Sequence, residues 1–283
     1  MRIVLVLFSL FTMQSGMAQE SGDYAYGIFN FDGKKAEKIF TNDTRIRETP
    51  SISGKILDSL AANSSILIVS QSPVITRLGE RSANWYKISY TKNNTFGEGF
   101  VWGGNLAIKH VSKSGLDFLF GMQKSGKEWD QESKMDVPVN YASVKAFNGN
   151  ELVSEAIFKS GIGESLSYAD FEIEDNRKLK NVDFIIKSLV SGEACGIPSY
   201  EQRLLFANNE LVHLPLQMSI GDADMFYHSE DLVFPNDKGG KPNTIFLKME
   251  EMEKDDNEKE HFKRRQDEYR WDGKVLSQIL TLK

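Results

Sequence analysis

The feature that most constrains the fold is a long succession of short apolar runs separated by turn residues. After residue 18, runs rich in valine, isoleucine, phenylalanine and tyrosine alternate with Asn-Gly, Asp-Gly and Gly-Gly pairs and with prolines. These pairs accept the positive φ angles of tight hairpin turns, and the runs have the composition of strands. No convincing stretch of helical periodicity interrupts them. The sequence therefore predicts an all-β protein.

Residues 1–18 have the pattern of a secretory signal peptide. Arg2 supplies a positive start, residues 3–13 are almost continuously apolar, and the small residues Gly16 and Ala18 suit a cleavage site. The apolar run is shorter than the ~20 residues that a membrane-spanning helix needs. We therefore expect cleavage after Ala18, no transmembrane anchor, and a periplasmic or secreted protein.

Charge and cysteine content exclude several classes of function. The 34 basic and 40 acidic side chains give a net charge of −6, which is a poor match to a nucleic-acid backbone. The single cysteine excludes an intramolecular disulfide and any multi-cysteine metal site. The loops at 175–183 and 237–243 contain too few carboxylates and too many basic residues for calcium. We predict no nucleic-acid partner, no metal and no cofactor.

Residues 39–108 contain an ordered series of motifs. An Arg-x-Arg…Pro opening at 44–51 is followed by Gly-Lys-Ile-Leu at 54–57, Trp-Tyr-Lys-Ile at 85–88 and Gly-Glu-Gly-Phe-Val-Trp at 97–102. This order resembles that of the bacterial SH3 (SH3b) family. The resemblance implies a small SH3-like barrel, which we place at residues 24–110. It also implies a binding role towards cell-envelope peptides or peptidoglycan.

Apolar residues alternate with polar ones in this region, as expected for half-buried strands of a small barrel. The alternating residues are Ile46, Ile56, Leu60, Ile66, Ile68, Ile88 and Val101. Two features depart from the family pattern. Residues 71–84 are long for the family's turn and are predicted to form an inserted, mobile loop. The usual Gly-Trp-Val reads Gly-Phe-Val at 99–101, with a tryptophan displaced to Trp102.

Four aromatic residues in or beside the expected loops are the candidate ligand-binding residues: Trp85, Tyr90, Phe96 and Trp102. An extended peptide or a sugar could stack on such rings. The alternative for each of them is a place in the barrel core, since large aromatics dominate small cores as well as binding surfaces.

Residues 112–283 are predicted to form a larger β-domain, joined to the first by the polar segment 109–115. Three hairpins are expected, at 143–153, 203–212 and 268–276. Each has an aromatic residue just before its turn, namely Phe147, Phe206 and Trp271. The repeat is weakly similar to integrin-type (FG-GAP or VCBS-like) repeats, so the domain is expected to be a β-meander, either propeller-like or an open sheet.

The sequence does not assemble a recognisable set of catalytic residues. Cys195 is not followed by a helix that would activate a thiol, and we expect it to be buried. His228 with Asp222, Asp224 and Glu230 forms the one carboxylate and histidine cluster worth considering. The sequence therefore predicts an exported, non-enzymatic binding protein. Two alternatives remain open: an envelope hydrolase using that cluster, and a purely structural or interaction subunit.

Overall fold

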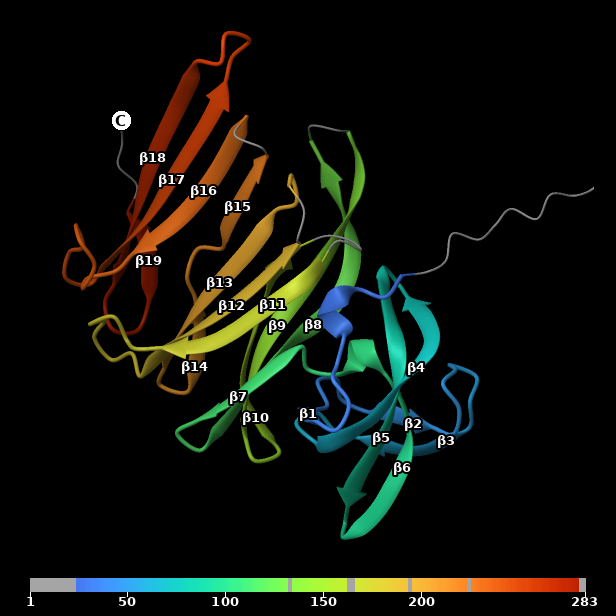
Figure 1. Cartoon of the computed structure of the whole chain (residues 1–283). Helices are drawn as coiled ribbons and strands as arrows, with labels where there is room; N and C mark the ends of the chain where they lie inside the picture. Colours follow the sequence, from blue (N-terminus) through green and yellow to red (C-terminus); the bar gives the residue numbers. More distant parts are fainter. Residues whose placement is uncertain (1–23, 132–133, 162–165, 193–194, 223–224, 280–283) are drawn as a thin grey trace, which may run out of the picture.

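The computed structural model describes residues 24–131, 134–161, 166–192, 195–222 and 225–279 (Figure 1). Apart from two short 3₁₀ turns, η1 (Gly27–Phe29) and η2 (Gly103–Asn105), the regular structure of these residues consists of antiparallel strands. The all-β prediction is confirmed. The predicted signal peptide at 1–18 lies outside the described residues. In the part that is described, no helix has the length and apolar character needed to cross a membrane.

The N-terminal region forms a six-stranded antiparallel sheet with the order β1-β4-β5-β6-β2-β3. Its strands are β1 (Ala36–Lys38), β2 (Thr44–Arg47), β3 (Ile56–Leu60), β4 (Ser65–Leu78), β5 (Arg81–Lys92) and β6 (Thr95–Trp102). The apolar residues that the sequence analysis expects to face the core of the barrel are buried, with one exception. The exception is Ile56, which is 47% exposed.

The prediction of a mobile loop at 71–84 is wrong, because these residues continue β4 and begin β5. Their pairing runs from Ile75 opposite Asn84 to Leu78 opposite Arg81, around a tight turn in which Gly79 has a φ of +64°. Pro73 lies where the register shifts between Gln71 and Ile75. A bulge tolerates the missing backbone N–H of proline, so Pro73 does not end the strand.

The middle of the chain forms a four-stranded antiparallel sheet, ordered β10-β9-β8-β7. Its strands are β7 (Lys109–Lys113), β8 (Leu116–Asp130), β9 (Met135–Asn148) and β10 (Glu151–Ser160). Residues 109–115, which the sequence marks as a polar connection, are the edge strand β7 and its turn into β8. Ser114 and Gly115 both have positive φ there, which suits a tight hairpin.

The remaining strands build a nine-stranded sheet, in which β14 pairs beside β13. These strands are β11 (Leu166–Glu174), β12 (Phe184–Gly192), β13 (Ser199–Ala207), β14 (Glu210–His213), β15 (Gln217–Asp222), β16 (Phe226–Val233), β17 (Thr244–Lys254), β18 (Glu260–Trp271) and β19 (Leu276–Ile279). Figure 1 shows this sheet extending away from the six-stranded sheet, with the four-stranded sheet between them.

All three predicted hairpins are present with the same local register. Phe147 lies opposite Leu152, Phe206 opposite Leu211, and Trp271 opposite Leu276. The three aromatic side chains nevertheless enter three different hydrophobic clusters. The similarity between these segments therefore reflects the requirements of a hairpin turn and not a repeated unit of packing.

The largest hydrophobic cluster is continuous through all three sheets. It includes Ile68 and Ile88 of the six-stranded sheet, Phe118 of the four-stranded sheet, and Ile186 and Phe206 of the nine-stranded sheet. Even-numbered residues of β12 face this cluster, while Ile185 faces a second cluster on the opposite side of the nine-stranded sheet. The N-terminal sheet therefore shares its core with the rest of the chain.

Candidate binding groove

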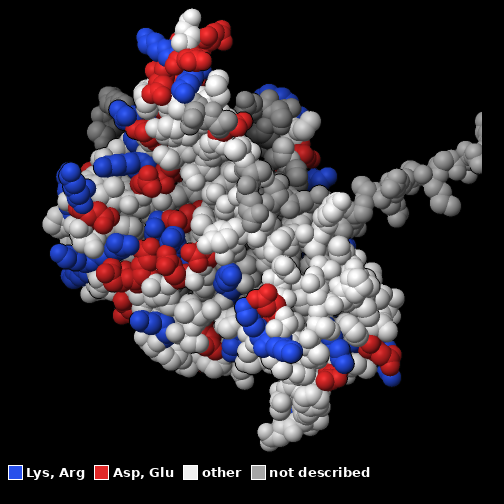
Figure 2. All heavy atoms as spheres, viewed as in Figure 1, with Lys and Arg blue, Asp and Glu red and all other residues white. Residues whose placement is uncertain are grey.

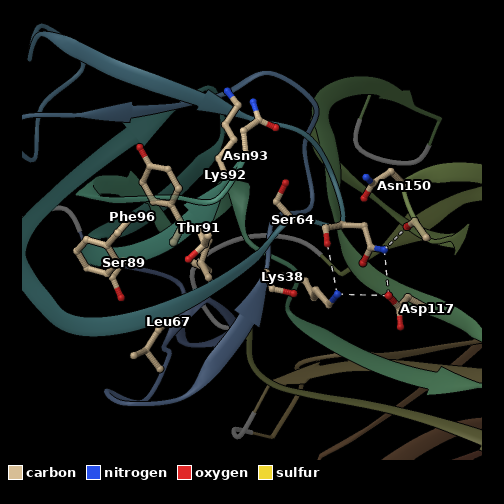
Figure 3. A pocket seen from close by; sticks show the side chains of 15 residues that line it. Lys38, Ser64, Leu67, Ser89, Thr91, Lys92, Asn93, Phe96, Asp117 and Asn150 are labelled. Carbon is tan, nitrogen blue, oxygen red and sulfur yellow. Dashed lines mark hydrogen bonds and ion pairs between the residues drawn. The ribbon is translucent and has the colours of Figure 1, made fainter.

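A groove of about 710 Å³ lies where the six-stranded sheet meets the turns of the four-stranded sheet. Figure 3 shows Phe96, Leu67 and Ser89 at one end and Asp117 and Asn150 at the other, with Lys38 between them. Its volume falls within the range of about 300–1,000 Å³ that is usual for ligand pockets. The lining residues are Lys38, Asn63, Ser64, Ser65, Ile66, Leu67, Ser89, Tyr90, Thr91, Lys92, Asn93, Phe96, Asp117, Gly149 and Asn150.

One end of the groove contains a hydrogen-bonded cluster of Lys38, Asn63 and Asp117. The Asn63 amide donates to Asp117 Oδ2 at 3.0 Å and to the Gly149 carbonyl at 2.6 Å. The Lys38 ammonium lies 3.3 Å from both Asp117 Oδ2 and the Asn63 carbonyl. Burial by itself would raise the pKa of Asp117, but hydrogen bonds from Ser112 and Asn63 and the charge of Lys38 outweigh it and lower this pKa. Asp117 is therefore a carboxylate at neutral pH.

Tyr90 of β5 is among the residues that line the other end of the groove, and its side chain belongs to the largest hydrophobic cluster. Its ring lies against Gly97 on β6, where a Cβ atom would come within 2.5 Å of the ring. Glycine at this position is thus required by the close approach of Tyr90. Burial first, and then the neighbouring Asp58 carboxylate, raise the pKa of Tyr90 to about 12. Asp58 also accepts a 2.7 Å hydrogen bond from Lys92.

Phe96 stands at the tip of the β5–β6 hairpin, beyond a turn in which Asn93 and Asn94 both have positive φ. Asparagine tolerates this conformation better than most residues, which explains the sharp turn. The Phe96 side chain is 66% exposed, and Leu67 nearby is 43% exposed. The hairpin therefore presents an aromatic ring to solvent at the mouth of the groove.

The structure divides the four predicted ligand-binding aromatics between two places. Tyr90 and Phe96 line the groove. Trp85 and Trp102 face each other on β5 and β6 and are each 2% exposed. Their indole N–H groups donate to the Thr76 side chain and the Thr76 carbonyl, at 2.8 and 3.0 Å. The two tryptophans are parts of the core, as is the Tyr90 side chain, so Phe96 is the one exposed aromatic residue among the four candidates.

The residues of the polar end were not among the sequence candidates. Lys38, Asn63 and Asp117 are far apart in the chain, and each has an ordinary sequence context. The only available signals were polar turns, Asn-Ser-Ser at 63–65 and Asn-Gly-Asn at 148–150. Turn residues in a sequence predict that these side chains are exposed. They do not predict which other turn the side chains contact.

The cluster considered for catalysis is only partly assembled. Glu230 Oε1 lies 3.2 Å from His228 Nε2, and Glu251 Oε1 lies 3.2 Å from His228 Nδ1. Asp222 is exposed, and Asp224 lies outside the described residues.

The expectation of a buried thiol is wrong, because Cys195 is exposed in the turn between β12 and β13. In the part of the chain that is described, no group of three or more acidic, histidine or cysteine side chains could hold a metal ion.

A second polar surface covers one face of the nine-stranded sheet. Lys187 lies 2.9 Å from Glu172 and 3.8 Å from Glu201, and Arg203 lies 3.4 Å from Glu174. Figure 2 shows acidic and basic side chains gathered over this sheet. Burial raises the pKa of the Glu201 carboxyl. Because the charges on this face pair with one another, we assign it a structural role.

Comparison of the chain with protein-family models, with curated proteins and with solved structures finds no match. The groove and the sequence resemblance described above are therefore the basis for a proposed function.

The raised pKa of Tyr90 predicts a loss of stability in alkaline solution. Folding keeps Tyr90 protonated above the ordinary tyrosine pKa of about 10, so its contribution is complete below pH 10 and is lost as pH rises towards 12. We expect this contribution to be at most about 2–3 kcal/mol. Urea unfolding of the wild type and of Tyr90→Phe at pH 9 and pH 11.5 measures it. The wild type should lose more stability than the variant over this interval, and equal losses would contradict the assignment.

Proposed function

We propose that the protein is an exported, non-enzymatic binding protein of the cell envelope. In this proposal, residues 24–110 are an SH3b-type barrel, and the groove beside it recognises peptidoglycan, an envelope peptide or an envelope protein. The observation that carries the proposal is the groove itself, with a solvent-exposed Phe96 and a lining of hydroxyl and amide side chains. Aromatic rings beside a few convergent polar groups are typical of binding sites.

A pull-down with purified, insoluble peptidoglycan tests this function. We expect the wild-type protein to be retained, and Phe96→Ala to reduce retention several-fold because it removes the exposed ring at the mouth of the groove. Phe262→Ala is the matched control, since Phe262 is also an exposed phenylalanine but lies on β18 outside the groove. No retention of the wild type, or equal retention of both variants, would contradict the cell-wall form of the proposal. Release of soluble fragments during the assay would favour the hydrolase alternative.

One observation favours the structural alternative as a second candidate. The six-stranded sheet shares a continuous hydrophobic cluster with the other two sheets, so its removal would expose buried residues such as Phe118 and Phe120. If deletion of residues 24–110 makes the remainder insoluble while Phe96→Ala leaves peptidoglycan retention unchanged, the N-terminal sheet is a scaffold and not a recognition module.

A further inference from the structure

We propose that the groove binds an uncharged oligosaccharide through its side chains, and not an extended peptide or a charged ligand. This inference rests on the proposed function, because it takes the groove as the binding site. It is drawn from three properties of the lining: its charge balance, the pairing of its strands, and the placement of its hydroxyl, amide and aromatic groups.

The charged residues of the groove are already paired. Lys38 lies 3.3 Å from Asp117, and Lys92 lies 2.7 Å from Asp58. An anionic ligand would have to compete with Asp117 for Lys38 and would place its charge beside a carboxylate. A cationic ligand would meet two ammonium groups. An ion of either sign would therefore bind poorly, whereas a neutral polar ligand leaves both ion pairs intact.

The β4 and β5 residues that line the groove have little unpaired backbone to offer a peptide, and the edge strand β1, which contributes Lys38, is only three residues long. Residues Ser65–Leu67 of β4 pair with β1 on one side, and Ile66 and Leu67 pair with β5 on the other. Residues 89–91 of β5 lie between β4 and β6, and Ser89 and Tyr90 pair with both. A peptide that binds by adding a strand requires an unpaired sheet edge. The groove therefore presents chiefly side chains to a ligand.

The side chains that remain suit sugar hydroxyl groups. Hydroxyl and amide groups are presented by Ser64, Ser65, Ser89, Thr91, Asn93 and Asn150. Each can donate and accept hydrogen bonds, as a sugar hydroxyl does. The exposed Phe96 ring offers an apolar surface on which the C–H face of a sugar ring can lie.

Asn63 adds an unused acceptor at the polar end of the groove. Both amide protons of Asn63 are used, towards Asp117 and Gly149, and its buried Oδ1 atom has no hydrogen-bond partner in the described structure. The Lys38 ammonium has two acceptors for its three protons. Oδ1 is shielded from solvent, so Lys38 is the group of this cluster that a ligand can reach. A sugar hydroxyl group can accept the third Lys38 proton while the ion pair with Asp117 stays in place, whereas an anion would compete with Asp117 for the same ammonium group.

Isothermal titration calorimetry on the full chain tests the inference, with three uncharged tetrasaccharides (chitotetraose, cellotetraose and maltotetraose) and one acidic tetrapeptide as probes. We expect at least one tetrasaccharide to bind and the tetrapeptide not to bind. Lys38→Met should weaken saccharide binding at least about tenfold, because it removes a charged donor. Lys87→Met is the matched control: Lys87 is also ion-paired, with Glu98 at 3.3 Å, but lies outside the groove.

The outcomes separate this inference from the proposed function. Binding of the tetrapeptide alone, or saccharide binding that Lys38→Met and Lys87→Met change equally, would overturn the inference. If Lys38→Met does not fold, Phe96→Ala against Phe262→Ala provides the same comparison, with a several-fold loss expected only for Phe96→Ala. Phe96-dependent retention on peptidoglycan without saccharide binding would contradict the inference and support the proposed function. Saccharide binding without retention on peptidoglycan would support the inference and contradict the cell-wall form of the proposed function.

Discussion

Substituting Trp271 by alanine should lower the free energy of unfolding by about 3–5 kcal/mol. The Trp271 side chain is fully buried in the second hydrophobic cluster, which includes Ile185 and Ile245. Its indole N–H donates a 2.7 Å hydrogen bond to the Lys180 carbonyl, which would lose its partner. The expected loss is a large part of the roughly 5–15 kcal/mol that stabilises a typical folded protein.

Urea unfolding followed by circular dichroism measures this effect. Trp129→Ala is the control, because the Trp129 side chain is 56% exposed and its removal should change stability by less than about 0.5 kcal/mol. Equal losses for the two variants would show that burial of Trp271 does not hold the second cluster together.

Phe118→Ala should have an effect of similar size, about 3–5 kcal/mol, at the contact between two sheets. The Phe118 ring of β8 meets Phe184 and Phe206 of the nine-stranded sheet edge-to-face, at centroid distances of 5.5 and 5.3 Å. Phe184 and Phe206 stack on each other at 5.0 Å. Removing Phe118 leaves a cavity against both rings and weakens the attachment of the four-stranded sheet.

Hydrogen exchange locates this effect. In Phe118→Ala, amides of β12 and β13 should exchange faster relative to those of β18, which is remote from the cavity. Phe118→Leu fills most of the volume and should cost less than about 1.5 kcal/mol. If the alanine and leucine variants are equally stable, the loss does not follow the volume of the cavity, and the prediction is wrong.

Local features of the fold could be predicted from the sequence because short-range chemistry determines them. The Asn208-Asn209 pair adopts positive φ at both positions, and the flanking residues form the expected hairpin. Alternation at Ile66 and Ile68 correctly identified the buried face of β4. The prediction at 71–84 is wrong because a stretch that is long for the family's turn, and that contains Pro73, can extend a hairpin when a bulge accommodates the proline.

The groove could not be predicted for a different reason. Asn63 and Asp117 meet across 54 positions of sequence, and the Gly149 carbonyl joins them from a third turn. This contact depends on how the two sheets pack against each other. The sequence periodicity of neither sheet encodes that packing. The tryptophans were equally ambiguous, since the same residue type fills a core or lines a binding surface. Only burial separated Trp102 from Phe96.

The lengths of the outermost strands have a consequence for solubility. Open sheets offer unpaired backbone groups at their margins, which can template aggregation with other copies of the chain. Among the described residues, four of the six sheet margins are short or positively charged: β1, β3 and β19 contain three, five and four residues, and β7 begins and ends with a lysine. The margins β10 and β11 are longer, with ten and nine residues. Short or positively charged margins give an incoming strand few groups to pair with. Strand addition by another copy of the chain is therefore limited chiefly to the margins β10 and β11, although the sheets do not close into complete cylinders.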